Sequence, residues 1–144
     1  MFDRNKAALR RGYEAIGKGN AAVFHEYMAP NYVFHGPGGL ELKGPEGFGQ
    51  YVTMLRAAFP DMHMAAMSMV SEGDYVAHRA TFTGTHRGDW TGIAPTGKRV
   101  TATGNVLSRF SGGKEAEAWM EYDTLALYQQ LGMMPLIGRG PAGI

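Results

Sequence analysis

The sequence of 144 residues contains no cysteine, which excludes disulfide bonds, thiolate nucleophiles and zinc sites built from thiolates. It also lacks a charge bias, because 14 basic and 13 acidic residues give a net charge of +1. Without a basic patch, nucleic acid and anionic membranes are poor candidate partners. No apolar run approaches the roughly 20 residues that cross a bilayer, and the N-terminus has no signal-peptide pattern. We therefore expect a cytoplasmic protein with no nucleic-acid or membrane partner.

Glycine is abundant instead, at 21 of 144 residues, about double the average usage near 7%. Ten methionines indicate a core or cavity lined with adaptable side chains. A chain of this length forms one domain with a core of its own. We place that domain at residues 1–132, followed by a Gly- and Pro-rich tail at 133–144 that lies over the surface or an opening.

The spacing of apolar residues predicts three N-terminal helices, at residues 3–18, 21–28 and 45–59. Asp3 is placed to cap the first helix, and Pro45 takes the first position of the third. Alternation with period two predicts strands at residues 32–35, 62–70, 75–83, 99–110 and 115–122. A change of alternation between Met64 and Met67 indicates a bulge.

The last predicted strand shows the alternation best. Ala116, Ala118, Met120 and Tyr122 fall on one side, and Glu115, Glu117, Trp119 and Glu121 on the other. The first side is suited to a core or an apolar pocket, and the second to water or a partner subunit. Helices followed by strands predict an α+β fold, a cone in which a strongly curved antiparallel sheet packs against three N-terminal helices and encloses a pocket.

Short motifs are spread over nearly the whole chain. They are Phe59-Pro60-Asp61, Gly84-Thr85-His86 with Gly88, Pro95-Thr96-Gly97-Lys98, Arg109-Phe110, Gly113-Lys114, Glu117 with Trp119, Asp123, and Gln130-Leu131-Gly132. This set resembles the SnoaL-like proteins, which are often labelled polyketide cyclases or ester cyclases. The resemblance implies the conical α+β barrel of the nuclear transport factor 2-like superfamily. Because that fold hosts enzymes and non-catalytic binders alike, it does not by itself fix an activity.

The resemblance also implies a mechanism. Cyclases of this family close a ring by intramolecular aldol condensation without metal or cofactor, using an aspartate in the last strand and a histidine in the preceding one. In this sequence the aspartate position falls on Met120 and the histidine position on Val106, and two polar pocket positions fall on Ile16 and Tyr51. A thioether and an isopropyl group cannot transfer protons, so the known acid/base pair is missing here.

Two other polar residues are candidates for proton transfer if the protein is an enzyme. Asp123 is the carboxylate nearest to the missing acid, although it also precedes residues 124–127, where a helix N-cap belongs. His86 lies at a strand end beside a glycine-rich corner. It acts either on a ligand carbonyl or as a loop histidine bonded to nearby backbone.

The remaining histidines carry weaker signals. His35 ends a strand, where it either lines the pocket or has a structural role. His63 and His78 lie inside strands, which favours a solvated or hydrogen-bonded strand face. The histidines have no local spacing typical of metal ligands. We therefore expect neither a metal nor a cofactor.

Trp119 allows two interpretations. It either anchors a partner subunit on the outer face of the sheet, which its alternation favours, or lies in the pocket over a planar ligand. We accordingly expect a homodimer. The expected pocket is lined by Ile16, Tyr51, Leu55, Val106, Met120 and Trp119, with His35, His86 and Asp123 as polar groups.

The sequence thus predicts a protein that binds a small hydrophobic molecule, either polyketide-like or a cyclic carbonyl compound. Whether it also transforms this molecule, as a cofactor-independent cyclase, isomerase or lyase, is left open. The alternative is a non-catalytic ligand-binding or dimerisation module that has lost the cyclase pair.

Overall fold

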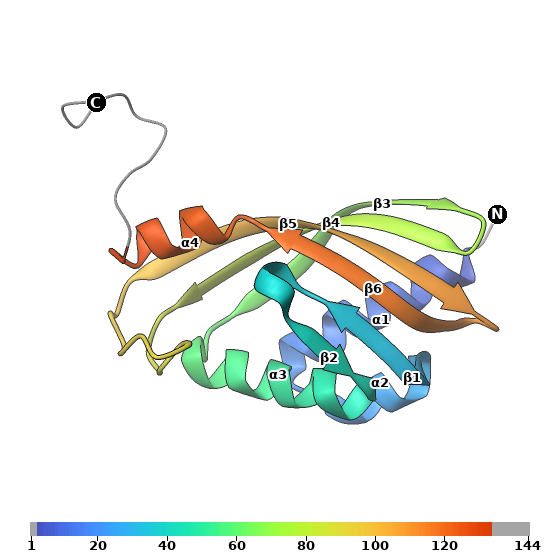
Figure 1. Cartoon of the computed structure of the whole chain (residues 1–144), viewed down its shortest axis with the longest axis horizontal. Coiled ribbons are helices and arrows are strands. Elements are labelled where there is room, and N and C mark those ends of the chain that lie inside the picture. Colours follow the sequence, from blue (N-terminus) through green and yellow to red (C-terminus); the bar gives the residue numbers. More distant parts are fainter. Residues whose placement is uncertain (1–2, 134–144) are drawn as a thin grey trace.

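The computed structural model describes residues 3–133, and helices α1 to α3 lie on one side of a curved six-stranded sheet (Figure 1). The elements are α1 (Arg4–Lys18), α2 (Ala21–Tyr27), β1 (Met28–His35), the 3-10 turn η1 (Pro37–Gly39), β2 (Glu41–Lys43), α3 (Gly44–Ala58), β3 (His63–Glu72), β4 (Tyr75–Thr85), β5 (Arg99–Ser111), β6 (Lys114–Tyr122) and α4 (Thr124–Gln130). The predicted α+β class is confirmed. Apart from Met133, the predicted tail lies outside the described residues.

Local signals place the helix ends. Asp3 caps α1, because its carboxylate accepts hydrogen bonds from the backbone N–H groups of Asn5 and Lys6 at 3.0 and 3.1 Å. Gly19 ends α1 in the left-handed conformation, with φ of 68°. α3 has proline at its second position and buries an apolar face that includes Phe48 and Val52. The three predicted N-terminal helices are therefore confirmed, and α4 adds a fourth after Asp123.

The strand order is β2-β1-β6-β5-β4-β3. Neighbouring strands are antiparallel except β1 and β6, which run parallel. The expectation of a wholly antiparallel sheet is wrong at this pair, because β1 comes from the N-terminal half and lies beside the last strand. β2 was not predicted, since three residues are too few to show an alternation.

Besides an irregularity between Met28 and Val33, where β1 pairs with β6, two bulges interrupt the sheet. The predicted one is confirmed in β3, where the register with β4 shifts between Ala66 and Ser68. The second was not predicted: Arg109 pairs with Glu117, whereas Phe110 pairs with Glu115, so Ala116 is an extra residue on β6. Because of this extra residue, Glu115 turns to the inner face. The prediction that Glu115 faces outward with Glu117 is therefore wrong.

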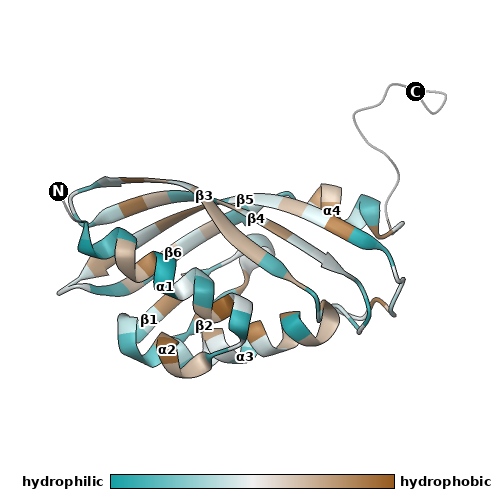
Figure 2. Ribbon diagram, turned by 180° about the vertical axis from the view of Figure 1, so that it is seen from behind, coloured by the Kyte–Doolittle hydropathy of each residue, from teal (hydrophilic) through white to brown (hydrophobic). Residues whose placement is uncertain are grey.

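The inner face of the sheet and the facing sides of the helices form the core. Aromatic rings dominate it, with Phe48 in edge-to-face contact with Phe24 and Tyr32. Along the long strands, hydrophobic and hydrophilic residues alternate (Figure 2), so that one face is apolar and the other polar. Within residues 3–133, none of the helices has the length and apolarity needed to span a bilayer.

Candidate functional site

A cavity of about 130 Å³ lies between the inner face of the sheet and the helices. Its wall includes five residues assigned to the pocket from sequence: Ile16, Tyr51, Leu55, Val106 and Met120. Most of the wall is aliphatic or aromatic, which suits a hydrophobic ligand. The volume is close to that of a cavity of about 150 Å³ that holds benzene. A ligand with more than one ring therefore requires flexible wall residues, such as Met64 and Met120, to move.

Val106 and Met120 are direct partners across β5 and β6, and both line the cavity. These are the positions to which the family resemblance assigns the histidine and the aspartate. The structure therefore puts two groups without ionisable protons side by side in the cavity wall. Any proton transfer in this cavity has to use other residues.

A chain of polar side chains crosses the core at another part of the wall. The Tyr13 hydroxyl lies 2.6 Å from Nδ1 of His78, and Nε2 of His78 lies 2.9 Å from the Ser108 hydroxyl. Ser108 is hydrogen-bonded in turn to the carboxyl group of Glu115. Tyr13, His78 and Glu115 line the cavity, and they come from α1, β4 and β6. The chain ends in a carboxyl group that is only 4% exposed.

Burial shifts the protonation of these groups. It raises the pKa of Glu115 to about 7, although the hydrogen bond from Ser108 acts in the opposite direction. Burial lowers the pKa of His78 to about 4, so its imidazole is neutral at pH 7. Burial and the nearby Glu115 raise the pKa of Tyr13, which keeps its hydroxyl protonated. Tyr13 therefore donates to His78, His78 to Ser108, and Ser108 to Glu115.

Sequence reasoning missed this chain. Glu115 was assigned to the outer face because the alternation of residues 115–122 contains no sign of the bulge. His78 was treated as a hydrogen-bonded or solvated strand residue, and it is indeed hydrogen-bonded, but in the cavity wall. The available signal was the alternation of β4, which puts His78 on the same side as the buried Val76 and Ala80.

Asp123 lies outside the cavity wall. Its side chain is exposed, and Oδ1 accepts a hydrogen bond from the backbone N–H of Ala126 at 2.9 Å. This is the N-cap geometry anticipated for Asp123 at the start of α4. Its catalytic role stays a prediction.

His86 is fully buried, yet it too is absent from the cavity wall. The backbone N–H of Thr96 donates to its Nδ1 at 3.1 Å, and its ring packs against Phe59. Beside it, Asp61 accepts hydrogen bonds from the backbone N–H and hydroxyl of Thr85, both at 2.7 Å. The motifs around Phe59, Thr85 and Thr96 thus join the end of α3 to the segment between β4 and β5.

The same junction explains Gly88. A Cβ atom at this position would lie 2.3 Å from the carbonyl oxygen of Ala57, so only glycine fits. The surroundings of His86 are therefore those of a structural junction, and its catalytic role stays a prediction.

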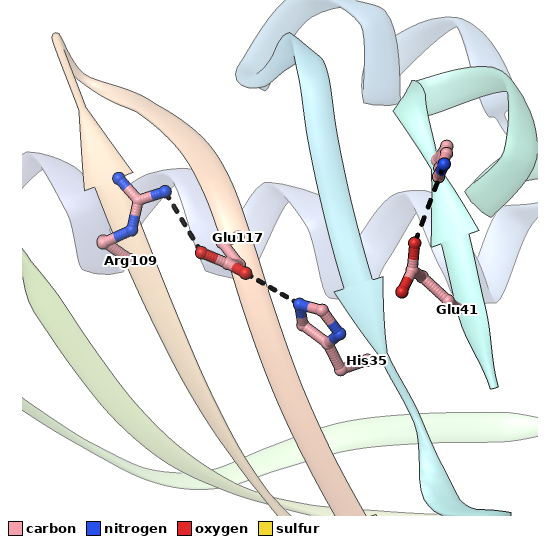
Figure 3. A network of polar contacts seen from close by, with 5 residues as sticks. His35, Glu41, Arg109 and Glu117 are labelled. Carbon is pink, nitrogen blue, oxygen red and sulfur yellow. Dashed lines mark hydrogen bonds and ion pairs between the residues drawn. The ribbon is translucent and has the colours of Figure 1, made fainter. Parts of the chain in front are cut away.

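His35 and Trp119 lie on the outer face of the sheet, and the expectation that they line the pocket is corrected. Their rings stack with centroids 5.6 Å apart. Nε2 of His35 donates to Glu117 at 2.7 Å, and Arg109 donates to the other Glu117 oxygen at 3.3 Å (Figure 3). The hydrogen bond from His35, followed by that from Arg109, lowers the pKa of Glu117. This carboxylate is therefore ionised at pH 7, whereas the buried Glu115, with a pKa of about 7, is only about half ionised there.

Comparison with known proteins adds family information to this geometry. A family model described as SnoaL-like polyketide cyclase matches residues 6–131. The chain is 33% identical over 132 residues to aklanonic acid methyl ester cyclase DauD of Streptomyces sp. (strain C5), with 86% of this chain and 79% of DauD covered. It is also 33% identical over 132 residues to aklanonic acid methyl ester cyclase DnrD of Streptomyces peucetius, covering 86% and 88% of the two chains.

Solved structures give the same picture of the fold. IdmH from Streptomyces antibioticus superimposes with a TM-score of 0.80 and 30% identity, over 90% of this chain and 99% of IdmH. TsrD from Streptomyces laurentii superimposes with a TM-score of 0.83 over 93% of this chain and all of TsrD. At 24% identity, the second similarity concerns the fold alone.

Proposed function

The chain belongs to the SnoaL-like polyketide cyclase family, and on this premise we propose that it binds and transforms a small hydrophobic carbonyl compound of polyketide type. The reaction is cofactor-free acid/base chemistry in the cavity between sheet and helices. The apolar wall and the cyclase names of DauD and DnrD support this proposal. The residue pair used by the family's known mechanism is absent, so the proton has to move to another group.

The observation that carries the proposal is Glu115, a carboxyl group buried in an apolar cavity with a pKa raised to about 7. A general acid/base works best when its pKa lies near the working pH. Asp123, which is exposed and caps α4, and His86, which is outside the wall, fit this role less well. We therefore assign proton transfer to Glu115 instead of these two sequence-based candidates.

The proposed step balances without a cofactor. The Glu115 carboxylate takes a proton from a carbon next to a ligand carbonyl, so that the C–H bond breaks and an O–H bond forms on Glu115. The electron pair moves onto the carbonyl oxygen as an enolate. The enolate carbon then bonds to a second carbonyl carbon of the same molecule, and the alkoxide formed takes the proton back from Glu115. The product is a ring closed by aldol addition.

The pH dependence of hydrogen exchange tests this proposal. In D₂O, the protein is expected to catalyse exchange of the acidic benzylic hydrogens of 2-tetralone, a two-ring ketone, as followed by ¹H NMR. Because the ionised form of Glu115 is the base, the rate constant should rise with pH and level off above about pH 7. A rate no higher than that of buffer alone, at any pH, would refute the proposed chemistry.

Non-catalytic binding is the second candidate function. The apolar pair Val106 and Met120, at the family's acid/base positions, is the observation that favours it. In that case 2-tetralone would bind without exchanging its hydrogens. The exchange assay therefore separates the two candidates.

We further propose that the protein is a homodimer formed through the outer face of the sheet. The strand register aligns Val70, Ala77, Leu107, Trp119 and His35 in one row across that face. Trp119 is 38% exposed and Leu107 40%. An exposed apolar row that includes a tryptophan is typical of a protein interface.

Replacing Leu107 with glutamate is expected to weaken dimerisation by roughly 30-fold or more, because a buried charge without a partner is costly at the centre of an interface. Sedimentation velocity over a range of protein concentrations measures the effect. The matched control is Met54→Glu, since Met54 is equally apolar and 56% exposed but lies on α3. Equal dimerisation of both variants would contradict this interface.

A further inference from the structure

Trp90 lines the cavity with a hydrogen-bond donor that has no acceptor among residues 3–133. The side chain lines the cavity and is only 4% exposed. Its indole Nε1 is buried and has no hydrogen-bond partner among residues 3–133. A buried polar group without a partner costs free energy, and in native proteins such groups are few. This donor therefore calls for a functional explanation.

The backbone around Trp90 holds the ring in place. Trp90 and Ile93 exchange two backbone hydrogen bonds of 3.0 and 2.9 Å around a two-residue turn. The turn residues Thr91 and Gly92 have φ of 50° and 87°, as in the type I′ turn that usually contains Asn-Gly. A β-branched threonine is unfavourable in this conformation, at an order of 1 kcal/mol or more. Asp89 supports the turn by accepting a hydrogen bond from the N–H of Gly92.

Aromatic rings pack against Trp90, and no residue of the described range 3–133 supplies an acceptor for its Nε1. The centroids of Tyr51 and Phe59 lie 6.0 and 5.9 Å from that of the indole, both in edge-to-face geometry. His86 has the other buried nitrogen without a partner in the described chain, Nε2, but His86 is not in the wall. Among residues 3–133, Trp90 is thus the residue with an unpartnered buried donor that lines the cavity.

Trp90 and Glu115 mark different parts of the cavity. Trp90 packs on Tyr51. Tyr51 in turn lies near Tyr122, which adds to the effect of burial in raising the pKa of Tyr51. Tyr122 and Glu115 both line the cavity from β6, near opposite ends of that strand. Trp90 therefore lies toward the other end of the cavity from Glu115. A ligand that uses both residues has a functional group at each end.

We propose that the Nε1–H of Trp90 donates a hydrogen bond to a ligand carbonyl oxygen, at the end of the cavity away from Glu115. This inference rests on the proposed function, whose ring closure already needs two carbonyl groups, and narrows its substrate class to compounds that present one of them at the end of the cavity away from Glu115. One carbonyl is held by Trp90, and another acidifies the C–H bond next to Glu115. Trp90 is then a binding residue that selects oxygenated ligands over hydrocarbons of the same shape.

The experiment compares two ligands of nearly the same shape, cyclohexanone and methylenecyclohexane. They differ only in the group doubly bonded to one ring carbon, which is =O in the first and =CH₂ in the second. The chain has two tryptophans, so a ¹H–¹⁵N spectrum contains two indole signals, and Trp119→Phe identifies that of Trp90. Cyclohexanone is expected to move the Trp90 indole proton downfield, as a new hydrogen bond does. Methylenecyclohexane should occupy the cavity without this downfield shift.

The variant Trp90→Phe keeps an aromatic ring and removes the donor. It is expected to lower the preference for cyclohexanone over methylenecyclohexane by about fivefold to tenfold, the effect of one hydrogen bond. The ratio of the two dissociation constants cancels the change in cavity volume, which affects both ligands. The preference should stay unchanged in Trp119→Phe, the matched control on the outer face.

The outcomes separate this inference from the proposed function. If cyclohexanone binds without moving the Trp90 indole signal, or if Trp90→Phe keeps the full preference, the role of Trp90 is refuted. Binding of neither ligand would also overturn it. A shifted indole signal in a protein that does not exchange 2-tetralone hydrogens would support Trp90 and refute the acid/base role of Glu115.

Discussion

Replacing Glu115 with glutamine is expected to lower the rate constant for 2-tetralone hydrogen exchange by about 10²- to 10⁴-fold, the usual contribution of a general acid/base. Glutamine has nearly the same shape as glutamate, and its amide oxygen still accepts the hydrogen bond from Ser108. It cannot take up a proton at neutral pH. The variant therefore removes proton transfer and leaves the cavity wall in place.

The control is Glu117→Gln, two residues further along β6. Glu117 faces outward, where it binds His35 and Arg109, so this variant should keep the exchange rate within about twofold, as surface substitutions usually leave the fold intact. Binding of 2-tetralone, measured separately by ligand-observed NMR, should persist in both variants. An active Glu115→Gln variant would transfer the catalytic role to another residue, and Asp123 and His86 would be tested next.

The same Glu115→Gln substitution is expected to stabilise the fold at alkaline pH. The pKa of Glu115 is about 7 in the folded protein against an ordinary value of 4.5. Below pH 4.5 the carboxyl is neutral in both the folded and unfolded states, so it has no electrostatic cost. As pH rises from 4.5 to 7, the unfolded state ionises more readily, and the folded state loses relative stability. Above pH 7 the loss is complete, at about 3 kcal/mol for this pKa interval.

Glutamine does not ionise and escapes this loss. At pH 8 the variant should therefore unfold about 10 °C above the wild type, whereas near pH 4 the two midpoints should nearly coincide. Thermal unfolding followed by circular dichroism at several pH values measures this difference. Glu117→Gln should show no gain at pH 8, because the pKa of Glu117 is lowered and not raised. A Glu115→Gln variant that is less stable than wild type at pH 8 would show that Glu115 is not a strained buried acid.

Together, these two predictions describe a wild-type protein that is more active than the Glu115→Gln variant but less stable at alkaline pH. Keeping a carboxyl group in an apolar wall lowers stability at the pH where its base form is useful. Functional sites commonly retain such unfavourable groups. The chain from Tyr13 through His78 and Ser108 limits the cost, because it supplies a hydrogen bond to the carboxylate.

The sequence by itself determined the elements and the family. Helix ends depend on nearby residues, so Asp3, Gly19 and Asp123 could be assigned their capping positions from local spacing alone. Strand alternation is equally local, and it put Ala118, Met120 and Tyr122 on one side of the last strand, where all three line the cavity. The motifs from Phe59 to Gly132 were sufficient to predict the α+β cone.

Only the tertiary structure decided which polar groups reach the cavity. Glu115 turns inward because Ala116 is an extra residue opposite β5, and such a bulge depends on the pairing of two strands and leaves no periodic signal in one of them. The pairing of β1 with β6 puts His35 next to Trp119 on the outer face, where the two rings stack. Trp90 is in the wall because its turn folds back towards α3, a contact between segments about 40 residues apart in sequence. Local patterns fix the elements, whereas long-range pairing fixes the chemistry of the cavity.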